Sequence, residues 1–311
     1  MPFHEKHFWA LILGGSSGFG LASAKKLALW GMNIFLVHRD RRGAMAKLEE
    51  HFSAIRETGV ALEALNLDAL RADRRAEALT QLKTTIGDGR VRVLLHSIAA
   101  GRLKRFAPPR STQTADALQS LAAALGESPE AVGQAVKSLV ANGVDQLAPL
   151  LCEPAPDSSS MASEEDMADT IQAMGFNLLF WVQEVHERGL FADDARVMAL
   201  TSEGSVRVWP GYGPVSAAKA TLESVVRSLA TEFAPFGIRC NLLQPGVTDT
   251  PALRVIPGSE AMMARARQRN PLNRLTRPED VADVVALLSM DEASWINGAC
   301  IRVDGGEFVV V

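Results

Sequence analysis

Residues 8–20 read FWALILGGSSGFG, and this stretch decides the fold. Its first six residues are apolar and suit a buried strand, and the glycine-rich turn that follows opens a helical pattern. Glycines between a strand and a helix let backbone N–H groups approach a pyrophosphate at the helix N-terminus. A tight turn that binds nothing is the alternative. The stretch therefore predicts the first unit of an α/β fold and a candidate pyrophosphate site.

The rest of the chain alternates apolar runs with helical patterns, which is typical of a doubly wound parallel sheet with helices on both faces. An insertion is expected after the fourth strand, and in such sheets it should lie over the ligand crevice. Seven strands fit one Rossmann-like sheet within a single domain. The expected segments are strands at residues 8–13, 33–37, 60–65, 91–96, 196–200, 238–243 and 300–303, helices at 214–233 and 278–289, and an insertion over 102–164 with helices at 113–125 and 128–140, all within a domain spanning 1–311.

Composition excludes several classes of protein. The 311 residues are 47% hydrophobic, which is enough for one large α/β domain. A net charge of −4 gives no basic field for nucleic acid or an anionic membrane. The three cysteines have neither a metal-ligand spacing nor a disulfide pattern, and no segment approaches the ~18 apolar residues of a membrane helix. We therefore expect a cytoplasmic protein with no metal, nucleic-acid or membrane partner.

Tyr212 is the single tyrosine of the chain and stands seven residues before Lys219. Pro214 suits the first position of a helix with Gly213 as its N-cap, so Tyr212 should lie on the preceding loop and Lys219 on the second helical turn. A nearby ammonium lowers the phenol pKa from ~10 by roughly one to three units. The pair therefore predicts a tyrosine that acts as an acid at neutral pH.

Several motifs resemble those of the short-chain dehydrogenase/reductase superfamily, over nearly the whole chain except the insertion. The spacing Gly14-x3-Gly18-x-Gly20 matches its phosphate loop, and residues 244–250 match its Pro-Gly-x-x-x-Thr segment. The ending at residues 303–306 is also similar to that of the family. The cofactor-binding residues that this resemblance implies are Gly14, Ser16, Ser17, Gly18, Phe19, Gly20, Arg39, Asp68, Ala69, Ser97, Ile98, Lys219, Pro245, Gly246, Val247 and Thr250.

The end of the second strand indicates which nucleotide binds. An acid there marks NAD, whereas a basic residue can pair with the 2′-phosphate of NADP. His38 stands where NAD-dependent relatives carry aspartate, and Arg39 matches the arginine of NADP-dependent ones, so the resemblance implies NADPH over NADH. A solvated charge at a helix start is the alternative for Arg39. By the same resemblance, Asp68 holds the adenine amino group, while the Val247 backbone and Thr250 hold the nicotinamide carboxamide.

The tyrosine spacing resembles that of one branch of the superfamily. Ordinary members carry Tyr-x3-Lys, but four residues before Lys219 stands Val215. The Tyr-x6-Lys spacing and residues 95–100, LHSIAA, are similar to those of enoyl-[acyl-carrier-protein] reductases, and Ser202 matches their NADPH-dependent type. This resemblance implies hydride transfer to the β-carbon of a trans-2-enoyl thioester in fatty-acid biosynthesis. Tyr212 would stabilise the enolate and Lys219 would hold the nicotinamide ribose.

Ser202 and Asn177 also coincide with the catalytic serine and the helix asparagine of ordinary short-chain reductases. A hydroxyl at a strand end often only satisfies backbone groups, and an asparagine can be buried and structural, so both interpretations stay open for each residue. His96 is interpreted as a satisfied strand-end residue.

The segment at residues 252–270 is expected as a lid whose isoleucine and methionines suit a fatty acyl chain, with ordinary packing as the alternative. Its arginines, at positions 254, 265, 267 and 269, could dock an acidic carrier protein or could simply be solvated.

Three functions remain open on the sequence. The leading one is an NADPH-dependent enoyl reductase, a homotetramer by resemblance, acting on a thioester of acyl carrier protein or coenzyme A. A carbonyl or 3-ketoacyl reductase is supported by Ser202 and Asn177 and opposed by Val215. An NADPH-binding sensor or scaffold without turnover is opposed by the intact Tyr212 and Lys219.

Overall fold

The computed structural model of the protein describes residues 2–3, 7–108, 113–151, 161–256 and 258–310. Residues 109–112 and 152–160 of the expected insertion, and Pro257 of the expected lid, lie outside this part.

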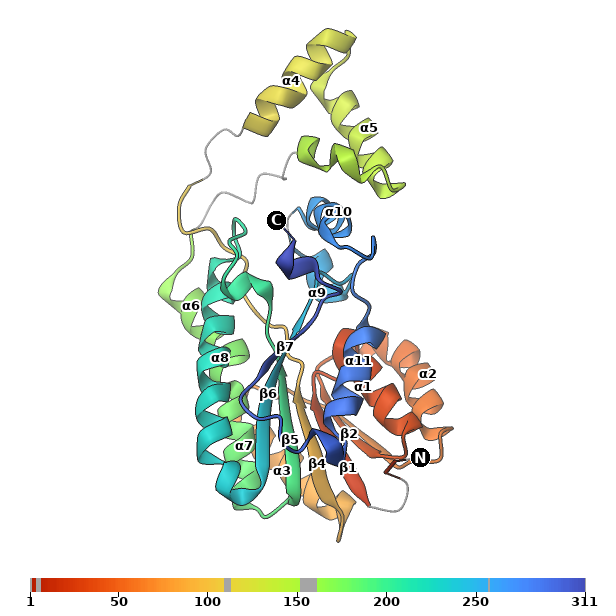
Figure 1. Ribbon diagram of the computed structural model, residues 1–311, viewed down its shortest axis with the longest axis vertical. Helices are drawn as coiled ribbons and strands as arrows, with labels where there is room; N and C mark the ends of the chain where they lie inside the picture. The colour runs from red at the N-terminus through yellow and green to blue at the C-terminus, as the bar shows by residue number, and fades with distance from the viewer. Residues whose placement is uncertain (1, 4–6, 109–112, 152–160, 257, 311) are drawn as a thin grey trace.

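Seven parallel strands form one sheet in the order β3-β2-β1-β4-β5-β6-β7, which confirms the expected doubly wound architecture (Figure 1). The strands are β1 (Phe8–Leu13), β2 (Asn33–His38), β3 (Leu62–Asn66), β4 (Arg90–His96), β5 (Phe191–Leu200), β6 (Ile238–Pro245) and β7 (Cys300–Val303). β5 begins earlier than expected because an irregular register lets Phe191 pair with Val91 before Arg196 pairs with Val93. The chain reverses strand order between β1 and β4, where such sheets bind ligands.

Helices cover both faces of the sheet, and the strand side chains alternate between them. Leu11 and Leu13 pack into the core under α3, α7 and α8, whereas Ala10 and Ile12 pack under α1, α2 and α11. Figure 1 shows α7 and α8 on one side of the sheet and α1, α2 and α11 on the other. The bounds are α1 (Gly18–Leu29), α2 (Met45–Arg56), α3 (Ala72–Ile86), α7 (Asn177–Glu187), α8 (Gly213–Glu232) and α11 (Pro278–Leu288).

The insertion forms a small helical unit beyond the carboxyl ends of the strands (Figure 1). It contains the expected helices α4 (Gln113–Leu125) and α5 (Pro129–Ala141), followed by a 3₁₀ turn over Asp145–Leu150. The Ser128 hydroxyl caps α5 by accepting the Ala131 N–H, as the Ser-Pro pair predicts. Its apolar residues form their own core, which also includes Ala264 of α10 (Ser259–Arg269). The insertion therefore packs against the lid segment.

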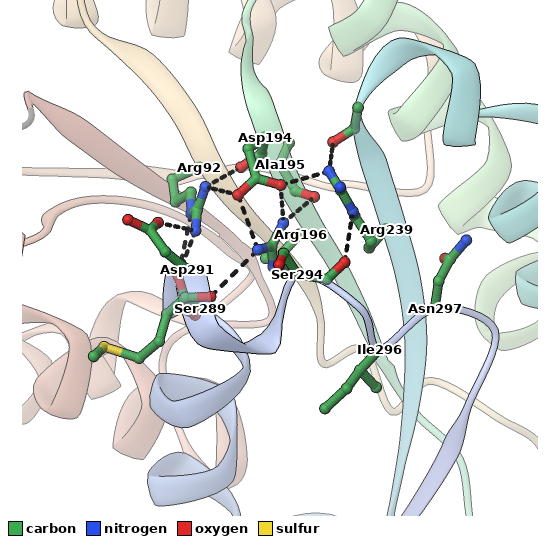
Figure 2. A network of polar contacts seen from close by, with 12 residues as sticks. Arg92, Asp194, Ala195, Arg196, Arg239, Ser289, Asp291, Ser294, Ile296 and Asn297 are labelled. Carbon is green, nitrogen blue, oxygen red and sulfur yellow. Dashed lines mark hydrogen bonds and ion pairs between the residues drawn. The ribbon is translucent and has the colours of Figure 1, made fainter.

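The amino-terminal halves of the central strands carry a partly buried cluster of charges (Figure 2). Arg92 on β4, Arg196 on β5 and Arg239 on β6 all contact the carboxylate of Asp194. Arg92 and Arg196 are each 1% exposed, and they also donate to carbonyl groups at the carboxyl end of α11. The guanidinium N–H groups satisfy helix carbonyls that have no partner within the helix, and their positive charge complements the helix dipole. This cluster ties three strands to one helix, at the opposite end of the strands from the ligand crevice.

Candidate active site

A cavity of about 800 Å³ lies at the carboxyl ends of the strands. Its walls come from the turns after β1, β2, β3, β4, β5 and β6 and from the helices that follow β5 and β6, α10 among them. Of the residues expected to bind cofactor or to act in catalysis, all line this cavity except Gly20 and Asn177. The sequence thus predicted a set of residues that the fold brings together from widely separated segments.

The turn between β1 and α1 fits a pyrophosphate. Ser17 is the N-cap of α1 but its hydroxyl makes no cap hydrogen bond, and the first turn of the helix has no acidic side chain. The amide groups and the positive end of the helix dipole therefore remain suited to an anion. Gly20 lies in the first turn of α1 and does not line the cavity. A Cβ atom there would collide with the Gly14 carbonyl oxygen, so glycine permits close packing of the helix on the turn.

Arg39 and Asp68 meet at the end of β2. The Arg39 side chain is 64% exposed, and its Nη1 donates to Asp68 Oδ2 at 3.0 Å. His38 is buried and is held by Asp40, with 2.9 Å between His38 Nδ1 and Asp40 Oδ2. The structure thus presents an accessible guanidinium at the cavity edge, where the resemblance places the 2′-phosphate of the nucleotide.

Tyr212 lies at the amino-terminal end of α8, beside Ser202. The helix begins at Gly213, so Tyr212 and not Gly213 is the N-cap residue. The phenol oxygen lies 3.5 Å from Ser202 Oγ, and Ser202 Oγ also accepts the Gly204 N–H at 3.0 Å. A Cβ atom at Gly204 would come within 2.4 Å of the Tyr212 ring, so glycine is required for this close approach. Ser202 therefore both caps its own turn and touches the phenol.

Burial governs the ionisation of both Tyr212 and Lys219. It raises the pKa of the Tyr212 phenol, more than the hydrogen bond with Ser202 lowers it. Burial also lowers the pKa of Lys219 to about 8, and its Nζ donates to the Leu200 carbonyl at 2.7 Å. The expected lowering of the phenol pKa by the lysine is therefore wrong for the protein alone. A neutral phenol suits hydrogen-bond donation to an oxyanion.

Asn177 lies behind the cavity, at the start of α7. A π-helical turn over Gln172–Phe176 precedes it, and its Nδ2 donates to the Ala69 carbonyl at 3.3 Å. Burial, followed by the charge of Lys219, lowers the pKa of His96 to about 3, and Asn177 counteracts part of this shift. Within the described part of the chain, neither His96 ring nitrogen has a hydrogen bond of ordinary geometry. His96 is thus a buried neutral ring, and the expectation of a satisfied strand-end residue is wrong because no described group lies in ordinary hydrogen-bond geometry to its nitrogens. Asn177 does not line the cavity.

The segment after β6 uses its polar groups internally. The Thr250 hydroxyl accepts the Leu253 N–H and caps the short helix α9 (Pro251–Arg254). The Val247 N–H donates to Glu307 Oε2 at 3.2 Å. This amide is therefore already occupied within the chain, and the carboxamide-binding role expected of the Val247 backbone stays a prediction.

Two family descriptions match the amino-terminal and carboxyl-terminal parts of the chain, and each match extends into the insertion. Residues 8–123 match the family described as short chain dehydrogenase, and residues 151–307 match the family described as Enoyl-(Acyl carrier protein) reductase. The chain belongs to the short-chain dehydrogenase/reductase superfamily.

Curated relatives of this short-chain dehydrogenase/reductase include proteins with different activities. A 4-formylbenzenesulfonate dehydrogenase, TsaC1/TsaC2, of Comamonas testosteroni is 34% identical over 151 residues, which cover 47% of this chain and 60% of the relative. A 1-cyclohexenylcarbonyl-CoA reductase of Streptomyces collinus is 38% identical over 123 residues, covering 39% and 44%. The chain thus spans about half the length of these relatives.

A solved enoyl-[acyl-carrier-protein] reductase (NADH) of Aquifex aeolicus VF5 superimposes on the short-chain dehydrogenase/reductase described here with a TM-score of 0.71. The two chains are 22% identical, and the alignment covers 97% of this chain and 96% of the other. At this identity the likeness shows the fold alone.

In this short-chain dehydrogenase/reductase, the segment expected as a lid forms α9 and α10. Ile256 and Met262 line the cavity, as expected for an acyl pocket, whereas Met263 does not. Three of the four lid arginines are ion-paired within the chain, namely Arg254 with Asp249, Arg267 with Asp145, and Arg269 with Glu203 and Glu307. The guanidinium of Arg265 stacks on Trp209, 5.5 Å from the ring centroid. The lid arginines therefore do not form an unpaired basic face, which weakens the docking interpretation.

Sequence reasoning missed three residues around the cavity: Glu203 and Arg269, which line it, and Glu307, which contacts the Val247 N–H from outside the lining. Arg269 had been grouped with the surface arginines, and no pattern marks either glutamate. Glu307 directly follows the family-like ending at 303–306, and this position is the single feature of the sequence that could have pointed to it. Among the described residues, no helix is long and apolar enough to cross a membrane.

Proposed function

We propose that the protein is an NADPH-dependent enoyl-thioester reductase. The position of the chain's single tyrosine carries this proposal. Tyr212 lines the cavity, whereas Val215, which stands where ordinary short-chain reductases have their tyrosine, presents an apolar side chain to the same cavity. In ketone reduction the oxygen sits on the carbon that receives hydride, but in enoyl reduction it lies two carbons farther along. An acid displaced from position 215 to 212 suits the longer distance.

The chain's own residues have defined tasks in this reaction. A bound nicotinamide supplies hydride to the β-carbon of the enoyl thioester. The electron pair of the double bond then moves to the thioester oxygen, where the neutral Tyr212 hydroxyl donates a hydrogen bond to the enolate. The α-carbon finally takes a proton from solvent, giving the saturated thioester. Lys219, buried beside the cavity, would hold the ribose hydroxyls, and Ile256 and Met262 exclude water from the acyl chain.

Side-by-side turnover of two thioesters tests the function. Absorbance of NADPH should fall with a trans-2-octenoyl thioester and stay constant with an acetoacetyl thioester. Turnover of the keto substrate alone would overturn the proposal.

A carbonyl reductase is the second candidate. The contact of 3.5 Å between Tyr212 and Ser202 favours it, because a serine and a tyrosine can together hold a carbonyl oxygen. The acetoacetyl arm of the same experiment decides between the two reactions.

We propose NADPH as the nucleotide because the accessible guanidinium of Arg39 suits a 2′-phosphate. Arg39→Ala should raise the KM for NADPH about tenfold, since a charge-assisted phosphate contact is lost, and should leave the KM for NADH nearly unchanged. Arg41→Ala, a change in a neighbouring exposed arginine, serves as the matched control and should alter neither value. Equal changes for both nucleotides in Arg39→Ala would contradict the assignment.

By the family resemblance we also propose that the protein is a cytoplasmic homotetramer in fatty-acid biosynthesis, acting on thioesters of acyl carrier protein or coenzyme A. A monomeric mass in light scattering would remove the tetramer from this proposal. Purified carrier thioesters, compared with coenzyme A thioesters by kcat/KM, would identify the carrier.

A further inference from the structure

Glu307 is a buried carboxylate at the carboxyl-terminal end of the fold, with a side chain only 1% exposed. One oxygen accepts the Val247 N–H at 3.2 Å, and the other lies 2.6 Å from Arg269 Nη2. Burial raises the pKa of Glu307, against the opposing effect of Arg269. Burying a carboxylate away from water costs free energy unless the group is ion-paired and hydrogen-bonded. These two contacts therefore account for the presence of Glu307 in the interior.

The chain builds a specific support for this carboxylate. Asn270, at the end of α10, donates through Nδ2 to the Asp304 carbonyl at 2.8 Å. The two Asp304 carboxylate oxygens accept the N–H groups of Gly306 and Phe308 at 3.0 and 2.9 Å. These bonds fix the turn that holds residue 307, and the carboxyl-terminal segment lies beside the end of α10 (Figure 1).

The carboxylate reaches the segment after β6 at very close range. A Cβ atom at Gly246 would come within 2.7 Å of Glu307 Oε2, so glycine at this position leaves room for the contact. Glu307 does not line the cavity, whereas Gly246 and Val247 do. It therefore supports this segment from behind.

Arg269 connects the same carboxylate to two other walls of the site. It belongs to α10 and lines the cavity, and its Nη2 also contacts both carboxylate oxygens of Glu203, at 2.7 and 2.9 Å. Glu203 directly follows Ser202, the residue in contact with the phenol of Tyr212. One guanidinium thus joins the lid helix, the turn after β5 and, through Glu307, the segment after β6.

We propose that Glu307 and Arg269 are positioning residues, which hold residues 246–250, and with them the nicotinamide end of the cofactor, in register with the lid helix. The inference rests on the proposed function in one respect, namely that residues 246–250 face the nicotinamide. Movement of α10 would then displace residues 246–250 through the contacts of Arg269 and Glu307. Binding of the nicotinamide and ordering of the lid should therefore favour each other.

Binding of two ligands to Glu307→Gln tests this inference. One ligand is NADPH, and the other is 2′-phospho-ADP-ribose, which has the same adenosine and phosphates but no nicotinamide. Glutamine keeps the size of the side chain but cannot accept from both Val247 and Arg269. The Kd for NADPH should rise about tenfold, as expected for loss of one charge-assisted hydrogen bond, while the Kd for the fragment stays nearly constant.

Two further variants make the test specific. Arg269→Lys keeps the positive charge but cannot reach both glutamates, so it should show the same loss confined to NADPH. Arg274→Gln breaks a two-point ion pair with Asp280 that lies outside the cavity lining, and it should change neither Kd. Thermal unfolding of each variant verifies that it is folded.

Equal weakening of both ligands in the Glu307 and Arg269 variants would indicate a merely structural role and would overturn the inference, as would no change in either. The comparison needs no turnover. Suppose that the wild-type protein reduces no enoyl thioester, while Glu307→Gln selectively weakens NADPH binding. That result would refute the proposed function and support this inference.

Discussion

Replacement of Tyr212 by phenylalanine should lower kcat for an enoyl thioester by about 10²–10³-fold, the usual effect of removing one donor to an oxyanion. The phenol is the group we assign to the developing enolate, and burial keeps it protonated at neutral pH. Affinity for NADPH should stay nearly unchanged, because the ring itself remains. Steady-state kinetics and a nucleotide titration of the same preparation measure both quantities.

Ser202→Ala is the informative companion to that variant. In an enoyl reductase its effect on kcat should be much smaller than that of Tyr212→Phe, because Ser202 chiefly caps the turn at Gly204. In a carbonyl reductase the two losses should be comparable. A Tyr212→Phe protein that retains most of its activity would remove the phenol from the mechanism.

The largest effect on stability is expected from Asp194→Asn, far from the cavity. An amide of the same size cannot neutralise the three guanidinium groups that meet there (Figure 2). We expect the free energy of unfolding to fall by about 3 kcal/mol, the low end for a broken buried ion pair, because the carboxylate is partly exposed. Urea unfolding measures this change. Asp73→Asn, which breaks an exposed pair with Arg71, is the control and should have a far smaller effect.

The same carboxylate predicts how stability depends on pH. Burial alone would raise the pKa of Asp194, but hydrogen bonds from Arg196 and Arg92 outweigh it and lower the pKa to about 2 from an ordinary value of 3.8. A depressed pKa stabilises the fold above the unfolded value, and this stabilisation is lost as the pH falls from about 4 to about 2. Wild-type stability should decline more steeply in this window than that of Asp194→Asn. Parallel slopes would contradict the account of the cluster.

Local patterns were enough to predict much of the fold. Strong apolar runs identified all seven strands, and the Ser-Pro pair at residues 128–129 located an insertion helix with its cap. The start of β5 was missed because residues 191–195, FADDA, have no strand pattern, and Phe191 pairs with β4 through an irregular register. Elements were thus predictable wherever the hydrophobic pattern alone decides them.

The site was predictable where a residue belongs to a motif. The phosphate turn and the tyrosine–lysine pair do line one cavity. The pairing of Arg269 with Glu307 joins residues that are far apart in sequence, so no local spacing reveals it. The pKa of Tyr212 was predicted in the wrong direction because the sequence spacing suggests a nearby lysine but does not show the burial that raises the pKa of the phenol.

The position at which hydride arrives in the product tests the central claim most directly. NADPH carrying deuterium at C4 should be incubated with a trans-2-octenoyl thioester, and the product examined by NMR. We predict a saturated thioester with deuterium on its β-carbon. A protein that leaves the enoyl thioester unreduced, and instead turns an acetoacetyl thioester into a 3-hydroxy product deuterated on the alcohol carbon, would contradict the assignment of Tyr212 to enolate stabilisation.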